Sequence, residues 1–528
     1  MRTLLVFAWL LAFASSGAAD TYKRQPAVDV LHYQISLEFT DASDSIEATV
    51  TLHVHIREEE TPDMWLDFEG MAIDGLRVKG IETPFQYGDG RIKFRFPGNT
   101  ARHDIVDVEV RYHGVPARGL VIGRNSYGRR VLFTDNWPDH AHYWLPSIDH
   151  PSDKATVEMS VTAPDRYDVV ANGFLAETVS LNDGRRRSRW TETSAIPTYS
   201  IAVGVAEFSI VHEEASGVRL AWYSFPQDAE SAGQKFNRTA LILTYFTELI
   251  GPYPYRKLAQ VESVMRMTAM ENANTIFYRE SLFRTGQASD EPIPHEIAHQ
   301  WFGNSVTPAD WDHLWLSEGF ATYFDALFQE RLRGADALRS AMLEMEKRVK
   351  GFHLARTVPI IDETRTDLMK KLNPLNYEKG AWVLHMLRGL LGDSSFFEGI
   401  RRFYRYHQEG SVLSDDFKRV MESVSGRDLD GFFRQWLHRP GWPEYHMTWR
   451  WIEESEELVI SVSQAQRAGL FDVFTVIEIT QADGGEPVRL KVRLNEESHT
   501  FRIPAAHEPA SVELDPDVWL LKSVYKAH

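Results

Sequence analysis

The sequence predicts a multidomain α+β protein in which two β-rich domains flank a mainly helical one. Three observations support this prediction. The chain has 528 residues, which is too long for a single domain. Its apolar residues alternate with a period of two in the regions 20–225 and 442–528, whereas the region 226–441 follows the helical period. The composition, 43% hydrophobic and 25% charged, is that of a folded globular protein.

The N-terminal β domain, residues 20–225, is predicted from alternating segments that turn sequences separate. Apolar and polar residues alternate in HYQISLEF, IEATVTLHVHI, RIKFRF and IVDVEVRYH, as they do in half-buried strands. The stretches GDG, FPGNT and LNDG supply turn signals between such segments. We therefore expect a β-sheet domain of roughly 200 residues.

The central domain, residues 226–441, is predicted to be helical. AGQKFNRTALILTYFTELIG places apolar residues on one helical stripe and ends at Gly251, a residue that suits the position after a helix. Helical patterns follow in ALRSAMLEMEKRVKGF, YEKGAWVLHMLRGLL, SSFFEGIRRFYRYHQ and DDFKRVMESV, and KLAQVESVM is the one strand-like segment. After RPGWPE, five alternating segments predict a small β-sandwich over residues 442–528.

The first 19 residues predict a secretory signal peptide. Arg2 precedes a short apolar run, and small residues up to Ala19 offer a cleavage site. The alternative, a membrane anchor, needs a longer apolar run, so we expect no stable membrane span in the mature chain. The chain has no cysteine, which favours export to a bacterial periplasm or to the medium. The net charge of -18 argues against a nucleic-acid partner.

The stretch IPHEIAHQWFGNS carries the strongest chemical signal. His295 and His299 are four residues apart and therefore share one face of a helix, where both can bind one metal ion. Glu296 can reach a water molecule on the same metal. Pro294 suits the start of this helix and Gly303 its end. Alone, a pattern of this kind also occurs by chance in ordinary amphipathic helices.

A third ligand is predicted 19 residues after His299. Glu318 opens the helical stretch SEGFATYFDALFQERL, and the loop between the helices lets the second helix return past the metal. Two histidines and one glutamate leave a position open for water, which is typical of catalytic zinc sites. Asp325 lies two turns further on the same face and is expected to orient a ligand histidine, although a solvated helix acid explains it equally well.

Three motifs together give the sequence a family resemblance. HEIAHQWFGNSVT with WLSEGFATYF, TAMEN at 268–272, and Tyr377 in NYEKGAW resemble the M1 family of zinc aminopeptidases, the gluzincins related to aminopeptidase N and leukotriene hydrolase. The resemblance implies a thermolysin-like catalytic domain after an N-terminal β domain. Many members add a large helical domain after the β-sandwich, and we expect a short form without it.

The resemblance also implies a role for each matching residue. One Zn²⁺ on His295, His299 and Glu318 activates water, and Glu296 is the base. Tyr377 stabilises the oxyanion. Glu271 binds the free N-terminal amine of a peptide substrate, while the backbone around Ala269, Met270 and Asn272 lies along the peptide. Release of single N-terminal residues is the expected reaction.

The sequence departs from the family pattern at two places. Thr268 replaces the usual glycine of the second motif, so its methyl group is expected to narrow the pocket for the first substrate residue. Many family members supply a second amine anchor about nine residues before a Leu-Pro or Phe-Pro. Here that count from Pro146 reaches Trp137, with Asn136 and Asp139 nearby. No residue there is a clear substitute, and Asp139 is the best polar candidate. His140 and His142 raise the weaker alternative of a second metal site.

Three other functions remain open from the sequence. A thermolysin-like endopeptidase would share the metal site but would not use Glu271. An epoxide hydrolase would need a basic anchor for a fatty-acid carboxylate. A catalytically inactive peptide-binding protein would have lost a ligand or the base, and none of these residues is missing here.

Overall fold

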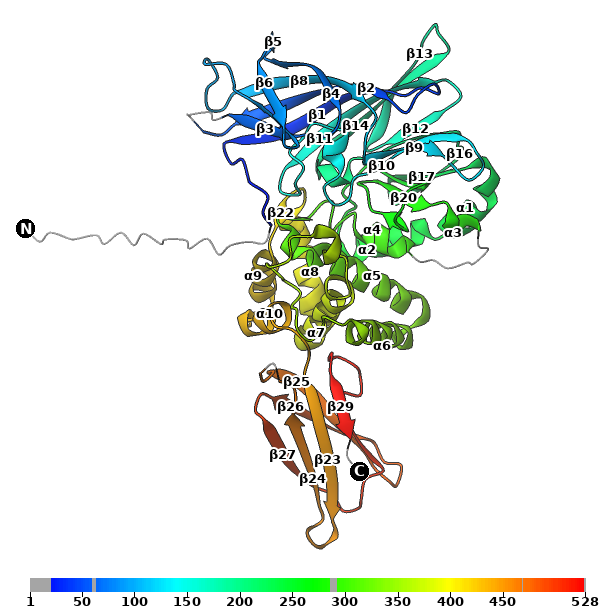
Figure 1. Cartoon of the computed structure of the whole chain (residues 1–528). Helices are drawn as coiled ribbons and strands as arrows, with labels where there is room; N and C mark the ends of the chain where they lie inside the picture. Colours follow the sequence, from blue (N-terminus) through cyan, green and yellow to red (C-terminus); the bar gives the residue numbers. More distant parts are fainter. Residues whose placement is uncertain (1–19, 59–62, 285–291, 468, 527–528) are drawn as a thin grey trace, which may run out of the picture.

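The computed structural model describes residues 20–58, 63–284, 292–467 and 469–526. It places them in three domains that follow one another along the molecule, with the N-terminal β domain at one end and the C-terminal β domain at the other (Figure 1). The predicted arrangement of β, helical and β domains is therefore confirmed. The expected signal peptide, residues 1–19, lies outside the described residues.

The N-terminal domain consists of three sheets whose apolar faces enclose one core. In β2 every second side chain, from Ile46 to Ile56, faces this core, as the alternating sequence predicts. The large sheet, in the order β13-β14-β11-β1-β2-β8-β4-β5, comprises Phe174–Ser180, Arg185–Pro197, Lys154–Pro164, Val28–Glu38, Ile46–Ile56, Ile105–Gly114, Ala72–Val78 and Ile81–Glu82. The smaller sheets are β12-β15-β10-β9 (Asp168–Ala171, Val203–Ala206, Arg130–Asp135, Gly119–Arg124) and β3-β7-β6 (Met64–Asp67, Arg91–Phe94, Phe85–Gly88).

The central domain opens with a sheet that begins upstream of residue 226. Its order is β16-β17-β18-β20-β19, with bounds Ser209–Ala215, Val218–Ser224, Lys257–Ser263, Thr275–Arg279 and Ala269–Met270. The sequence pattern predicts only one strand here, the segment that forms β18. The first two strands alternate like those of the preceding domain, so their pattern alone could not assign them to this sheet. β19 is the edge strand and pairs only with β20 among the described strands.

Helices form the remainder of the central domain. The α-helices are α1 Ala229–Phe236, α2 Thr239–Ile250, α3 Ser281–Arg284, α4 Ile293–Ala298, α5 Trp315–Arg333, α6 Ala335–Gly351, α7 Gly380–Leu391, α8 Asp393–His407, α9 Ser414–Ser425 and α10 Asp430–Leu437. Shorter elements are the π-helix Leu375–Lys379, the 3-10 turns Ala141–Tyr143, Thr198–Ser200, Pro226–Asp228, Trp311–His313, Leu368–Lys371 and Glu453–Ser455, and the paired strands β21 Thr307–Pro308 and β22 Ser411–Val412. No helix in these described segments is long and apolar enough to cross a membrane.

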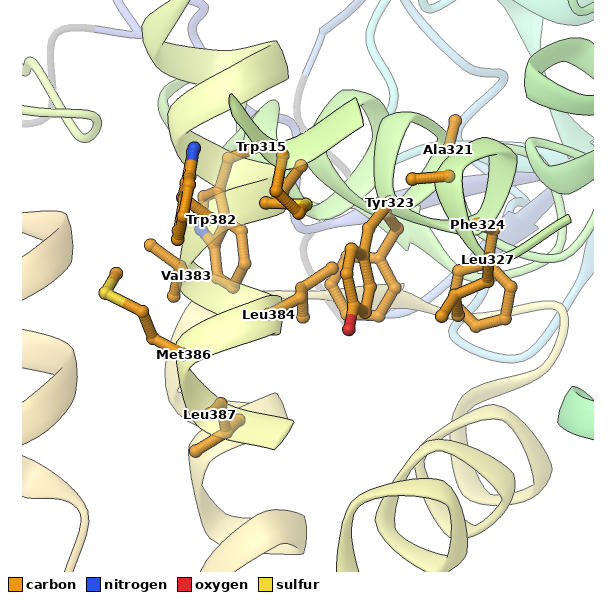
Figure 2. Close-up of a cluster of buried hydrophobic side chains, with 14 of the residues drawn as sticks. Trp315, Ala321, Tyr323, Phe324, Leu327, Trp382, Val383, Leu384, Met386 and Leu387 are labelled. Carbon is orange, nitrogen blue, oxygen red and sulfur yellow. The ribbon is translucent and has the colours of Figure 1, made fainter. Parts of the chain in front are cut away.

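The packing of α5 against α7 forms the centre of the helical core. Figure 2 shows large side chains of both helices gathered in this core, among them Trp315, Phe324 and Trp382. All three are buried. Because α5 starts with Trp315, this packing fixes the helix end that carries Glu318.

The C-terminal domain is a sandwich of two sheets. One sheet has the order β27-β24-β23-β29 and the other β26-β25-β28. Their bounds are Ser498–Pro504, Glu457–Gln464, Glu444–Ile452 and Ser523–Lys526, then Val488–Leu494, Val473–Thr480 and Ser511–Leu514. The five predicted strands are present, and two short ones add to them. Apolar side chains of both sheets join the same core as the helices.

Lys154 holds the N-terminal domain against the central one. It lies on β11, and its Nζ donates to the carbonyls of Asn304 (2.9 Å), Ser305 (2.7 Å) and Gly410 (3.3 Å). These three carbonyls belong to the loop that follows α4 and to the turn before β22. Burial lowers the pKa of the Lys154 ammonium to about 7. The contact between the domains therefore contains a group that titrates near neutral pH.

We expect the contribution of Lys154 to stability to rise with pH. An ordinary lysine titrates at 10.5, so between pH 7 and 10.5 the unfolded chain binds more protons than the folded chain. We therefore expect the free energy of unfolding, measured by denaturant titration, to rise more with pH for the wild type than for Lys154→Met across this range. Lys93→Met, at an exposed lysine of β7, should show no such trend. The prediction would be contradicted if the free energy of unfolding of the wild type, minus that of Lys154→Met, stayed constant or fell as the pH rises.

Candidate active site

The two histidines of HEIAHQ face each other at the end of α4. His295 Nε2 and His299 Nε2 are 3.0 Å apart. Pro294 lies in the first turn of the helix, as the sequence predicts. The helix ends at Ala298 rather than near Gly303, because the backbone beyond it forms first tighter turns, such as Gln300 N to the Ile297 carbonyl, and then wider ones from Asn304 onward. The histidines nevertheless keep the spacing of one helical turn, since His299 N still donates to the His295 carbonyl.

Gly303 allows these turns to fit against α5. Its φ is +128°, which favours glycine. A Cβ atom at this position would lie 2.5 Å from Ser317 Oγ and 3.1 Å from His299 Nδ1. Only a residue without a side chain lets the loop lie this close to the start of α5, and this proximity brings Glu318 to the histidines.

Glu318 completes a group of three metal-ligand side chains. Its Oε2 lies 3.4 Å from His295 Nε2 and 3.4 Å from His299 Nε2. Ligand atoms of a tetrahedral zinc site, with bonds of about 2.0–2.1 Å, are about 3.3 Å apart. Glu318 Oε2 is also a buried atom without a hydrogen-bond partner in the described chain. The donor types, their spacing and the unsatisfied oxygen all fit a bound metal ion.

His299 is oriented by the loop and by the start of α5. Its Nδ1 lies 3.0 Å from Ser317 Oγ and 3.2 Å from the Phe302 carbonyl. Contacts of this kind fix the ring so that Nε2 points toward His295 Nε2 and Glu318 Oε2. Asp325, expected in this role, accepts a hydrogen bond from the Gln329 amide at 3.3 Å. The orienting groups of His299 are thus Ser317 and Phe302, and a role for Asp325 toward His295 stays a prediction.

Glu296 and Glu271 lie beside the metal-ligand group. Ligand-type atoms of these two glutamates and of His299 all lie within 4.8 Å of one another. Burial raises the pKa of Glu296 well above its ordinary value and that of Glu271 to about 7. For Glu318, burial acts in the same direction, but the positive charge of His299 outweighs it and lowers the pKa. A positive charge between these acids would let all of them ionise.

Glu271 is held in place by two side chains that follow the HExxH sequence. Gln300 Nε2 donates to the Glu271 carbonyl at 3.1 Å, and Asn304 Nδ2 donates to the same oxygen. Gln300 Oε1 accepts from Asn274 N at 2.6 Å. Gln300 is fully buried, so these bonds are not exchanged with water. The amide of one side chain therefore joins the segment that carries Glu271 to the metal-binding helix.

The segment before Glu271 forms the edge of the sheet. Ala269 and Met270 make up β19, which pairs with β20 on one side. The other edge of this strand is available to an extended peptide. Asn272 is buried, and its carbonyl accepts from Thr275 N at 3.1 Å. Its side chain is therefore buried, while the free edge of β19 is the part of the segment along which a peptide can lie.

Tyr377 reaches the site from a π-helix, an element often found at functional sites. Its ring lies parallel to that of His295, with centroids 6.0 Å apart. Burial and the nearby charges of Glu318 and Glu271 raise the pKa of the Tyr377 hydroxyl well above its ordinary value. The hydroxyl therefore stays protonated and can donate a hydrogen bond.

Two glycines set the distance between Glu318 and Tyr377. Gly319 follows the glutamate on α5, and Gly380 begins α7 three residues after the tyrosine. A Cβ atom on Gly319 would lie 2.8 Å from Gly380 Cα and 3.1 Å from the Asn376 carbonyl. The two backbones are in direct contact, so no side chain fits between them.

The expected second amine anchor is not provided by Asn136. Its amide donates to the Ile201 carbonyl at 2.8 Å and its Oδ1 accepts from Trp144 Nε1 at 2.8 Å, so both ends are engaged inside the N-terminal domain. Trp137 is buried against Trp311. Asp139 is therefore the remaining polar candidate. Burial raises the pKa of its carboxyl group.

The second metal site considered at His140 and His142 is not supported. His142 Nδ1 pairs with Asp149 at 2.9 Å. Within the described residues, neither histidine belongs to a group that gathers three metal-ligand atoms.

Several residues of the site were not predicted from the sequence. Ser317 directly precedes Glu318, and Gln300 and Asn304 follow His299 by one and five residues. Their adjacency to ligands was the only available clue. Their roles depend on contacts with distant segments, which spacing along the chain does not show.

The fold and the site together define a zincin-type domain, in which HExxH supplies two ligands and a downstream glutamate the third. A family model described as "Peptidase family M1 domain" matches residues 234–436, and one described as "Peptidase M1 N-terminal domain" matches residues 29–200. The chain belongs to peptidase family M1.

Two relatives with similar sequences are named as aminopeptidases. The glutamyl aminopeptidase of Bitis rhinoceros is 25% identical over 446 residues, which are 79% of this chain and 47% of that protein. Probable aminopeptidase 2 of Sulfurisphaera tokodaii is 26% identical over 401 residues, 72% of this chain and 50% of that protein. The chain thus spans about half the length of these relatives.

The same fold occurs in a solved structure. Aminopeptidase A of Legionella pneumophila, in complex with aspartic acid, has a TM-score of 0.83 and 17% sequence identity. The similarity covers 97% of this chain and 61% of that one. All three domains described above are therefore included in the shared fold.

We expect Gly319→Ala to reduce peptide hydrolysis strongly while it lowers the stability of the fold less. An added methyl group must push α5 and α7 apart, and a shift of about 1 Å between Glu318 and Tyr377 reduces catalysis about 100-fold. Peptide hydrolysis by the purified variant measures this effect. Gly233→Ala in α1, where an added Cβ meets nothing within 4 Å, should retain full activity. Equal activity of the two variants would contradict the role given to the glycine contact.

Proposed function

We propose that the chain is a zinc-dependent aminopeptidase that removes single residues from the N-terminus of peptides. One observation supports this most directly: the carboxylate of Glu271 lies within 4.8 Å of Glu296 and of His299. An acid at this place binds the α-ammonium of a peptide. The amine nitrogen and the first carbonyl carbon of a peptide are only about 2.5 Å apart, so this anchor leaves the first carbonyl beside the metal ligands.

Zinc at His295, His299 and Glu318 would supply a Lewis acid that polarises the scissile carbonyl and acidifies the attacking water. Glu296 takes the proton from this water and returns it to the departing amine. Its buried position suits both steps, because its raised pKa makes it a stronger base than an exposed glutamate.

Tyr377 and the edge strand complete the proposed mechanism. The protonated hydroxyl of Tyr377 donates to the oxyanion that forms on the scissile carbonyl. The backbone of Ala269 and Met270 pairs with the substrate chain as an added strand does. The substrate ammonium provides the charge that ionises Glu271, whose pKa is otherwise about 7.

A thermolysin-like endopeptidase and an inactive peptide-binding protein are the alternatives. An endopeptidase would have no use for a buried acid at the end of the substrate cleft. A binding protein would not need Glu296 beside the ligand histidine. We also propose that the chain acts after export, in a bacterial periplasm or in the medium; the apolar N-terminal sequence and the absence of cysteine support this location.

A peptide digest tests the proposed function. One ten-residue peptide, free or N-acetylated, is incubated with the enzyme with and without a chelator, and the products are identified by mass spectrometry. We expect a ladder of single-residue losses from the free peptide only, abolished by the chelator and restored by zinc. Internal cuts in both peptides would show an endopeptidase instead. Absence of cleavage across peptides with varied first residues would favour the binding protein.

The role of Glu271 is tested by Glu271→Ala. Loss of a buried charge pair with the substrate amine should reduce kcat/KM for the free peptide about 30-fold or more. Zinc content, measured by atomic absorption, should not change. Glu213→Ala, at an exposed glutamate of β16, is the matched control and should behave as the wild type. Unchanged kcat/KM in Glu271→Ala would refute the amine anchor.

The contact between Gln300 and the Glu271 segment is tested by Gln300→Ala. The variant leaves buried backbone groups without partners, and the segment that carries Glu271 loses its link to α4. We expect KM for free peptides to rise about tenfold, with zinc content unchanged. Gln34→Ala, at an exposed glutamine of β1, serves as the control. A variant that keeps the wild-type KM would show that Gln300 does not position the anchor.

A further inference from the structure

A large cavity lies away from the metal-ligand group. It occupies about 970 Å³ where the N-terminal domain meets the outer strands of the central sheet. Its walls come from β12, β13 and β14 on one side and from β16, β17 and the segment after α2 on the other (Figure 1). It shares no residue with the two groups that gather metal-ligand atoms. Cavities of this size between domains are typical of small-molecule sites.

The wall of the cavity is largely apolar and aromatic. Trp190, Tyr253 and Tyr255 line it. Leu175 and Ile210 also belong to the lining, and they are 49% and 37% exposed. Large apolar side chains at the rim of a concave apolar surface favour a ligand with an apolar body.

The charged residues of the cavity are mostly basic. Arg219 and Arg256 are exposed lining residues, and neither has an acidic partner in the part of the chain that the structure describes. The one acid among the lining residues, Asp168, is already within 3.4 Å of Arg186. The protein has a net charge of -18, whereas the two arginines without acidic partners make the opening of this cavity locally positive.

A further basic group lies below the aromatic wall, the amine of Lys257, whose pKa burial lowers to about 7. Lys257 Nζ stacks 4.5 Å from the centre of the Trp190 ring and donates to the Ala171 carbonyl. Arg256 lies over the ring of Phe174 at 5.3 Å. The contact of Arg256 with Phe174 holds a permanent positive charge at the aromatic surface, so an anion can be bound there without displacing an acidic side chain.

We propose that this cavity binds a small carboxylate with an apolar body, aromatic or acyl. The apolar body lies against Trp190 and the tyrosines, and the carboxylate faces Arg219 and Arg256. Guanidinium groups recognise carboxylates by paired, charge-assisted hydrogen bonds, which gives the cavity its selectivity for an anion.

Isothermal titration of the full chain tests this site with two carboxylates. 3-Phenylpropionate represents an aromatic body and octanoate an acyl body, and the stronger ligand identifies which body the cavity prefers. 3-Phenylpropanol lacks the charge and acetate lacks the body, so both should bind at least about tenfold more weakly. Equal binding of the alcohol would overturn the proposed role of the arginines. Failure of both carboxylates to bind would overturn the site.

Variants locate the binding. Arg219→Gln and Arg256→Gln should each weaken 3-phenylpropionate about fivefold, the effect of a partly solvated charge pair, and Ile210→Asp should weaken it further. Matched controls are Arg450→Gln on β23 and Ile105→Asp on β8, both exposed strand residues. A carboxylate bound by the metal site would not respond to the cavity variants. Binding that is unchanged in all three cavity variants would therefore refute the proposal, whether or not the chain hydrolyses peptides.

Discussion

Three buried carboxylates that converge on one histidine are the constraint on which the rest of the site depends. Glu271, Glu296 and Glu318 come from a sheet edge and two helices, and all three are removed from water beside His299. Burial opposes the ionisation of each acid, so the arrangement is favourable only when positive charge is present. In the proposed function, a metal ion among the ligands and a substrate ammonium at Glu271 would provide this charge at two neighbouring places. One buried acidic cluster would then bind two cations.

Placing these acids together requires backbone contacts that leave no room for side chains. Gly303 lets the loop after α4 lie against α5, and Gly319 meets Gly380 where α5 crosses α7. Asn304 then joins the domains: its side chain holds the Glu271 carbonyl and its own carbonyl accepts from Lys154 of the N-terminal domain. Asn304 alone thus links Lys154 of the N-terminal domain to Glu271, the proposed amine anchor, in the central domain. The two domains share one rigid support for the site.

The sequence predicted those parts of the site that depend on local periodicity. His295, Glu296 and His299 lie on one helix by spacing alone, and the loop length allowed Glu318 to return to them. Contacts between distant segments were not predictable. Ser317 orients His299 because the Gly303 turn brings the start of α5 to the histidine, a contact that the sequence did not show, and the predicted role of Asp325 stays a prediction. The strands β16 and β17 alternate like any half-buried strand, and only their parallel pairing with β18 assigns them to the central sheet.

The same backbone network links the proposed ligand cavity to the segment of Glu271. Ala171, at the end of β12, accepts from Lys257 beneath the cavity and from Thr275 Oγ1. Two residues further along the chain, Gly173 N donates to Asn274 Oδ1, and the backbone N of Asn274 donates to Gln300 Oε1. Buried hydrogen bonds of this kind have fixed partners, and a displacement at one end strains the others. The wall of the cavity and the amine anchor are therefore two ends of one hydrogen-bonded unit, although they share no residue.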